Sequence, residues 1–173
     1  MNRSLGFALC LFLAFLTAAC SKEVRKGTGR GLGPGQVSSS AQVVKVTAAP
    51  VNVSQSTGGD AVIALSISPG FHINANPATF PYLIATEVMP GKLEGINVGA
   101  PVYPAAVERK FQFAEQPLAV YEGEASIKLN LRAEANAATG RKSLPINVRV
   151  QACDEEQCFP PATINTTIPV TLQ

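Results

Sequence analysis

The sequence predicts an all-β domain built as an antiparallel sandwich, and three observations support this fold class. Short segments rich in β-branched and aromatic residues recur at even spacing from residue 42 to residue 173. Turn signals such as Pro69-Gly70 and Pro90-Gly91 separate these segments. No long stretch has the apolar spacing of an amphipathic helix. A region of about 130 residues is enough for one hydrophobic core but not for two.

The segments themselves carry strand signals. Clean alternation of polar and apolar residues in Ala125–Arg132 predicts a strand with one face in solvent. In Val107–Phe113, alternation places Arg109, Phe111 and Phe113 on one face. Residues 133–140 are short and end in glycine, so we expect a loop there. This pattern is typical of an immunoglobulin-like β-sandwich, although the central Trp and the distant Cys pair of immunoglobulin domains are absent. Ten candidate segments carry these signals, and from them we expect about eight or nine strands: Gln42–Thr47, Val51–Ser54, Ala61–Ser68, Phe71–Ile73, Leu83–Val88, Val107–Phe113, Leu118–Tyr121, Ala125–Arg132, Leu144–Gln151 and Ala162–Thr171.

The first twenty residues have the features of a bacterial lipoprotein signal peptide. Leu5–Leu16 is an apolar run of twelve residues, which is too short to span a bilayer permanently. The small residues that follow end on Cys20 and resemble a lipobox, in which the cysteine becomes the lipidated N-terminus. An ordinary signal peptide with an incidental cysteine is the alternative. We therefore expect a signal peptide at 1–20, a Gly/Ser-rich tether at 21–41, and a sandwich domain at 42–173, lipid-anchored to a membrane of the bacterial periplasm or cell envelope.

The charge balance and histidine content exclude several function classes. From residue 42 onward there are nine Lys/Arg and eleven Asp/Glu residues, a net charge of −2, so nucleic-acid binding has no support. His72 is the only histidine, and zinc sites need four ligands. We expect no metal and no cofactor, and we interpret His72 as a packing or hydrogen-bonding residue.

Two cysteines near the C-terminus, Cys153 and Cys158, are separated by four residues. Five extended steps would put their Cα atoms roughly 16 Å apart, whereas a disulfide needs about 4.4–6.8 Å. The chain must therefore reverse, and the strand-like flanks Asn147–Gln151 and Ala162–Val170 predict a hairpin in which the two sulfurs can bond. On spacing alone, a redox-active pair and a structural disulfide both remain open, and a metal site is less favoured.

The predicted hairpin loop carries three carboxylates, Asp154, Glu155 and Glu156. Negative charge disfavours a thiolate, so we expect this loop to raise the pKa of the cysteine thiols. Such a pair would be a slow general reductant and would need a specific partner. The alternative is that three exposed carboxylates only keep the turn soluble.

Five segments together resemble the N-terminal periplasmic domain of the DsbD family of thiol:disulfide interchange proteins: Pro69–Asn74, Leu83–Glu87, Pro101–Pro104, Pro117–Gly123 and Gln151–Pro161. The resemblance covers nearly all of residues 42–173 and implies an immunoglobulin-like sandwich with Cys153 and Cys158 as its redox pair. It also implies electron transfer from a thioredoxin-fold domain to periplasmic proteins that carry disulfides. Because the family protein continues into a membrane electron carrier and this chain ends at Gln173, we expect a separate donor, thioredoxin-like or a membrane carrier.

The chain departs from the family pattern in two places. The best-known members place five residues between the cysteines, and this chain places four. The family covers its disulfide with an aromatic cap loop, and here Arg109–Gln116, with Phe111 and Phe113, falls in the corresponding region without matching it residue by residue. Phe111 and Phe113 are thus expected cap residues. The rival hypothesis is a non-catalytic binding or assembly module with a structural disulfide.

Overall fold

The computed structural model describes residues 37–173. The predicted signal peptide, the lipidation site Cys20 and most of the predicted tether lie outside the described residues. Within residues 37–173, no helix has the length and apolar character that a membrane crossing requires.

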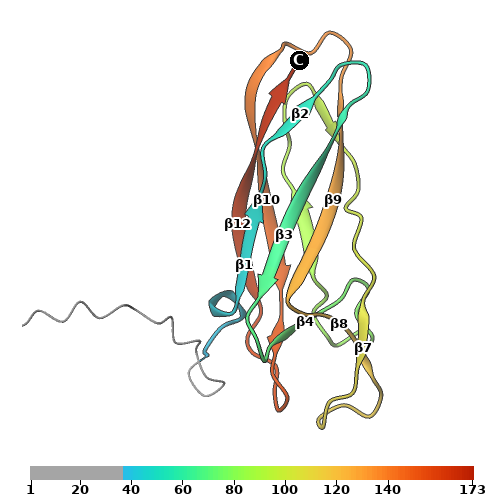
Figure 1. Ribbon diagram of the computed structural model, residues 1–173, viewed down its shortest axis with the longest axis vertical. Coiled ribbons are helices and arrows are strands. Elements are labelled where there is room, and N and C mark those ends of the chain that lie inside the picture. Colours follow the sequence, from blue (N-terminus) through green and yellow to red (C-terminus); the bar gives the residue numbers. More distant parts are fainter. Residues whose placement is uncertain (1–36) are drawn as a thin grey trace, which may run out of the picture. The chain divides into compact units, whose positions relative to one another are not determined.

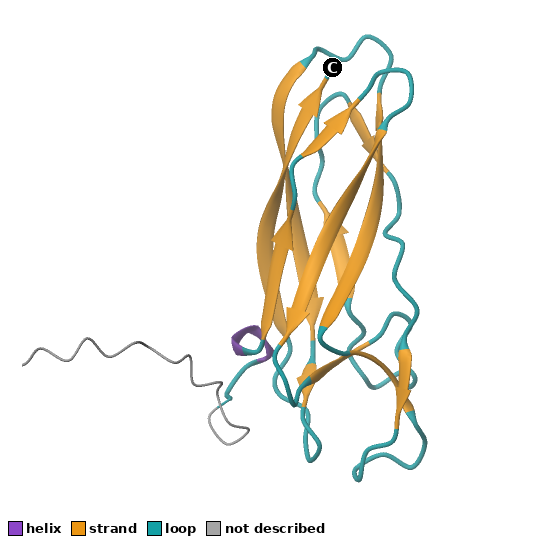
Figure 2. Cartoon of the chain, in the orientation of Figure 1, coloured by secondary structure: helices purple, strands orange, loops and turns teal. Residues whose placement is uncertain are grey.

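The described chain is made of strands, with one short 3-10 helix, η2 (Ser40–Gln42), before the first strand (Figures 1 and 2). The strands are β1 (Val44–Ala48), β2 (Val51–Val53), β3 (Gly59–Ile67), β4 (His72–Asn74), β5 (Glu87–Pro90), β6 (Ile96–Val98), β7 (Val107–Arg109), β8 (Leu118–Tyr121), β9 (Glu124–Ala133), β10 (Gly140–Val150), β11 (Ala152–Cys153) and β12 (Ala162–Leu172).

Three four-stranded sheets organise these strands, in the orders β1-β3-β9-β6, β2-β12-β10-β5 and β11-β4-β8-β7. All pairs are antiparallel except β2 with β12, which run parallel. The apolar residues of β3, β9, β10 and β12 that face inward form one continuous core. In β9, every second residue from Ala125 to Leu131 is buried, as the alternation predicts. The all-β, immunoglobulin-like sandwich predicted from the sequence is confirmed.

The third sheet lies at the end of the sandwich opposite the C-terminus, where Figure 1 labels β4, β8 and β7. One of its faces continues the main core through Ile73, Tyr121 and Ala152. These three residues are register partners across β11, β4 and β8, and directly opposed residues in a sheet point to the same side. The sheet is therefore anchored on one face and free to carry other groups on the second.

Two predicted strands are shorter than expected. β7 ends at Arg109, so Phe111 and Phe113 lie in a turn beyond it, and their predicted shared face with Arg109 is wrong. The ladder stops there because pairing with β8 ends at Arg109 opposite Leu118. The next residues turn back over the domain, and Phe111 is buried while Arg109 is exposed.

The second shortened strand is the predicted segment Leu83–Val88, of which only the end belongs to a strand, β5. The backbone N–H of Ile84 donates to the Gln151 side chain, and the N–H of Thr86 donates to the Asn74 carbonyl. These groups are thus used in irregular contacts and not in a ladder. The strand β6 was not predicted.

The packed domain also begins before Gln42. Ser40 is buried, its hydroxyl donates to the Pro160 carbonyl at 2.8 Å, and it accepts the N–H of Ala152 at 2.8 Å. Val37 packs against the main core. The end of the predicted tether is therefore fastened to the two ends of the cysteine hairpin.

Candidate redox site

The cysteine hairpin extends the longest ladder of the protein. β10 and β12 are paired up to Val150 opposite Ala162, and Cys153 then bridges to Cys158. The two sulfurs form a disulfide, with a Cα–Cα distance of 3.9 Å. The predicted hairpin and its bond are present. Whether the bond is redox-active stays a prediction at this point.

Asp154 shapes the four-residue loop between the cysteines. Its Oδ1 accepts the N–H groups of Glu156 at 2.8 Å and Gln157 at 2.9 Å, and its own N–H donates to the Gln157 carbonyl at 2.9 Å. Asp154 is buried, whereas Glu155 and Glu156 are exposed. The expectation of three exposed carboxylates is therefore wrong for Asp154, because its side chain folds back to cap the turn as Asp often does.

The third sheet places His72 directly opposite Cys153. Both residues lie on the face of this sheet that points away from the main core, because their neighbours Ile73 and Ala152 point into it. Val120, a register partner of Asn74 on the same face, belongs to a second, smaller apolar cluster. The disulfide thus sits on a sheet face with its own packing.

The smaller cluster contains Phe111, one of the two predicted cap residues. It consists of buried Phe111, Leu118 and Val120, with Phe80, Leu83 and Ala114 packed against them. The ring of Phe111 stacks on that of His72, with centroids 3.9 Å apart and an interplanar angle of 18°. Phe113 stacks in turn on Phe111, with ring centroids 5.4 Å apart, and is 41% exposed.

The loop that carries these two phenylalanines is closed by Lys110. Its Nζ donates to the carbonyl of Ala114 at 2.6 Å and also to the carbonyl of Glu115. Next to the loop, Arg109 Nε is 2.7 Å from Glu122 Oε1. The Lys110 contacts close the loop on itself, and the Arg109–Glu122 pair joins the end of β7 to the turn after β8, so the loop with Phe111 starts from a fixed point.

A hollow of about 310 Å³ opens beside Cys158. Cys158 is half-buried and lines the hollow, whereas Cys153 is fully buried. The rest of the wall is mostly apolar, and Tyr82 on its rim is 75% exposed. The hollow therefore makes the two cysteines unequal, because Cys158 lines it and Cys153 does not. The other lining residues are Tyr82, Leu83, Phe113, Ala114, Leu118, Glu156 and Gln157.

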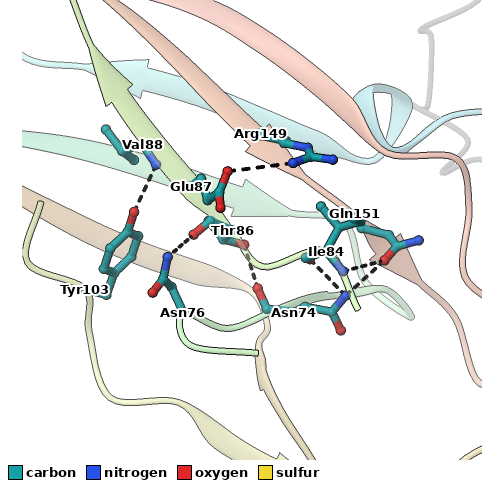
Figure 3. Close-up of polar contacts among 9 residues, drawn as sticks. All are labelled: Asn74, Asn76, Ile84, Thr86, Glu87, Val88, Tyr103, Arg149 and Gln151. Atoms are coloured by element: carbon teal, nitrogen blue, oxygen red, sulfur yellow. Dashed lines mark hydrogen bonds and ion pairs between the residues drawn. The ribbon is translucent and has the colours of Figure 1, made fainter. Parts of the chain in front are cut away.

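A polar network fixes the wall of this hollow to the hairpin (Figure 3). The Gln151 side chain accepts from Ile84 N at 3.1 Å and from Asn74 Nδ2 at 3.2 Å, and Thr86 Oγ1 donates to the Asn74 carbonyl at 2.6 Å. Gln151 directly precedes β11, and Ile84 directly follows the wall residue Leu83. The network therefore couples the position of the wall to that of Cys153.

His72 is the site residue whose place could not be found from the sequence. It is 2% exposed, and its Nε2 is buried without a hydrogen-bond partner. Burial lowers its pKa to about 4, although the negative charges of Glu122 and Asp154 act in the opposite direction and the positive charge of Arg109 adds to the lowering. The expectation that His72 packs is met by its stack on Phe111. Its location opposite Cys153 depends on the pairing of β4 with β11, which no local sequence signal predicts.

Within residues 37–173, no group of three or more His, Cys, Asp or Glu side chains is arranged to hold a metal ion. The groups gathered at this end of the sandwich are a disulfide, a neutral imidazole, aromatic rings and a hollow. This set includes a disulfide and a hollow beside one of its cysteines, and exchange with an external thiol needs a disulfide that the thiol can reach.

Comparison with known proteins shows the family of the chain. No curated protein sequence matches the chain. Among solved structures, the N-terminal domain of Neisseria meningitidis DsbD in its reduced form shares 18% identity over 76% of this chain and 90% of its own, with a TM-score of 0.46. The N-terminal periplasmic domain of ScsB from Proteus mirabilis shares 15% identity over 73% of this chain and 44% of its own, with a TM-score of 0.42. The family described as "Thiol:disulfide interchange protein DsbD, N-terminal" matches residues 40–169. Because this match spans most of the chain, the protein belongs to the DsbD N-terminal domain family, whose general chemistry is thiol–disulfide exchange.

Proposed function

We propose that this protein is a membrane-anchored thiol–disulfide relay outside the cytoplasm, in which Cys153 and Cys158 alternate between disulfide and dithiol. The observation that carries the proposal is the disulfide on a hairpin whose Cys158 borders an open, apolar hollow. Family membership supports the same chemistry. A structural disulfide that only closed the hairpin would have no need of such a hollow.

The unequal burial of the two cysteines supports one order of events. A partner thiolate attacks Sγ of Cys158 from the hollow, a partner–Cys158 disulfide forms, and the Cys153–Cys158 bond breaks with its electron pair on Cys153. The second thiol of the partner then attacks the partner sulfur of this mixed disulfide, and Cys158 leaves as a thiolate. Each new cysteine thiolate takes up a proton, so the partner is oxidised to a disulfide while the pair is reduced to two thiols. The reverse sequence reduces an acceptor disulfide.

The fold supports cycling because the sandwich does not depend on the bond. β10 and β12 are paired at every position from Gly140 opposite Leu172 to Val150 opposite Ala162, before the cysteines are reached. Closing a loop of four residues stabilises by about 2 kcal/mol, against a typical domain stability of about 5–15 kcal/mol. We expect the reduced domain to stay folded.

The partners follow from the same proposal. The electron donor is a separate thiol protein, thioredoxin-like or a membrane electron carrier, and the acceptor is a periplasmic protein with a disulfide. Lipidation of Cys20 holds the chain to a membrane, and residues 21–36, which precede the packed Val37, provide a tether. A flexible Gly-rich chain of about sixteen residues has an r.m.s. span of roughly 20–24 Å, which would let the hairpin reach partners near the membrane.

The test is the reduction potential of the pair, measured by equilibrating residues 37–173 with glutathione buffers, together with circular dichroism of both redox forms. We expect a potential between about −270 and −120 mV, the range of exchange proteins, and a folded reduced form. A pair that is reduced only below about −300 mV, with unfolding of the sandwich, would mark a structural bond and a binding or assembly module. In cells, Cys20→Ala should move the full chain from membranes to the soluble fraction, and unchanged membrane attachment would contradict the anchor.

A further inference from the structure

The side chain that faces Cys153 across the third sheet is that of His72. Directly opposed residues on antiparallel strands have Cβ atoms about 4.5–5.5 Å apart and lie on the same face, and Cys153 and His72 are such a pair. His72 Nε2 is buried and makes no hydrogen bond. Buried polar side-chain atoms nearly always have a partner, so an unpaired ring nitrogen beside a disulfide calls for an explanation.

The charged groups around His72 are already engaged elsewhere. Arg109 Nε donates to Glu122 at 2.7 Å, and Asp154 Oδ1 accepts two backbone N–H groups of its own turn. Glu155 is exposed and lines, with His72, Arg109 and Glu122, a second hollow of about 320 Å³. Among these side chains, only the ring of His72 combines burial, a free nitrogen and a place opposite Cys153.

Opening of the disulfide changes the charge and the hydrogen-bonding requirement of Cys153. When a thiol attacks Cys158, the electron pair of the broken bond goes to the buried Sγ of Cys153, whose next residue in the chain, Asp154, is also buried. A buried anion without a hydrogen bond is costly, and a nearby negative charge raises the cost. A disulfide sulfur is only a weak acceptor, whereas a thiolate is a strong one. A ring N–H of His72 would therefore make no hydrogen bond in the disulfide form and would have an acceptor in the reduced form.

We propose that His72 is a positioning residue for exchange, whose Nε2–H donates a hydrogen bond to the Cys153 thiolate as the disulfide opens. The inference rests on the proposed function and adds the group that receives the leaving sulfur. The low pKa of His72, about 4, keeps the ring neutral near pH 7, so it acts as an uncharged donor. Its effect opposes that of the loop carboxylates, since it favours the thiolate form of Cys153.

Two substitutions separate hydrogen bonding from packing. His72→Phe keeps an aromatic ring against Phe111 but removes the donor, and His72→Gln keeps an N–H donor in a side chain of similar reach. The first readout is the rate of reduction of the disulfide by dithiothreitol. The second is the pKa of the Cys153 thiol, followed by thiolate absorbance in a Cys158→Ser background, where Cys153 is the cysteine left on the hairpin.

We expect His72→Phe to slow reduction about tenfold and to raise the pKa of Cys153 by about one unit, as loss of a hydrogen bond to a charged group predicts. His72→Gln should recover most of both effects. Equal rates and equal thiol pKa values in wild type and His72→Phe would overturn the inference. If His72→Phe does not fold, the ¹⁵N resonance of His72 Nε2 in the wild-type protein is the deciding measurement. Nε2 should carry a proton at pH 7, and its resonance should shift when the disulfide is reduced. An unchanged resonance would overturn the inference.

The two proposals fail in different ways. If dithiothreitol cannot reduce the wild-type disulfide without unfolding the domain, the proposed relay function is contradicted. The pKa of Cys153 in the Cys158→Ser background reports on His72 without any redox step, so it is measured whatever happens to the relay. If the pair can be reduced but the pKa of the Cys153 thiol is the same with and without His72, only the inference about His72 is contradicted.

Discussion

The β10–β12 ladder and the third sheet differ in what holds them. β10 and β12 have 11 residues each and are paired over their full length, with inward residues such as Leu144 completely buried. The strands of the third sheet have 2 to 4 residues, and all three residues of its edge strand β7 are exposed. Stability is concentrated where ladders are long and cores are apolar. This protein therefore has its most stable region and its reactive bond in different parts of the fold.

The largest expected effect tests the stable region. Leu144→Ala removes a side chain of 0% exposure from the main core and should lower the free energy of unfolding by about 2–5 kcal/mol, measured by urea unfolding. The rate of disulfide reduction in the folded protein should stay unchanged. Asn147→Ala, an exposed position on the same strand, is the control and should change stability by no more than about 0.5 kcal/mol. A large change in reduction rate with Leu144→Ala would break the separation of the two regions.

A smaller effect comes from the third sheet and appears as a pH dependence. The pKa of His72 is lowered to about 4 in the folded protein and returns to about 6.5 on unfolding, so the unfolded chain binds more protons between these values. The stabilisation that comes from the neutral imidazole is then fully present above about pH 6.5 and is lost as the pH drops toward 4, by about 3 kcal/mol. This component should be missing from His72→Phe in denaturation curves recorded at several pH values. Identical pH profiles for the two proteins would show that His72 is not desolvated.

The smallest expected effect sharpens the difference between the two sulfurs. Cys153→Ser leaves the half-buried Cys158, and Cys158→Ser leaves the fully buried Cys153. The first variant should react with an aromatic disulfide reagent about tenfold faster, equivalent to about 1.4 kcal/mol in the barrier. Both variants should react equally in denaturant, which is the control. A faster reaction at Cys153 in the folded protein would reverse the proposed order of attack.

Some features were determined by the sequence alone, because they depend on residues close together in the chain. The alternation of Ala125–Arg132 encodes a half-buried strand wherever that strand is placed, and β9 has this form. The cysteine hairpin is equally local, since two strand-like flanks and a polar loop of four residues are enough to bring Cys153 opposite Cys158. The all-β fold class follows from many such local signals added together.

Other features were decided only by the tertiary structure. Phe111 is buried because the chain leaves the sheet at Arg109 and folds back over His72. Alternation alone predicted that Phe111 and Arg109 share one face. Leu83–Thr86 stays irregular because side chains from β4 and the hairpin take its backbone hydrogen bonds. The pairing of His72 with Cys153 joins segments far apart in the chain. Such contacts depend on which strands become neighbours when the core is buried, and periodicity within one segment carries no information about its neighbour.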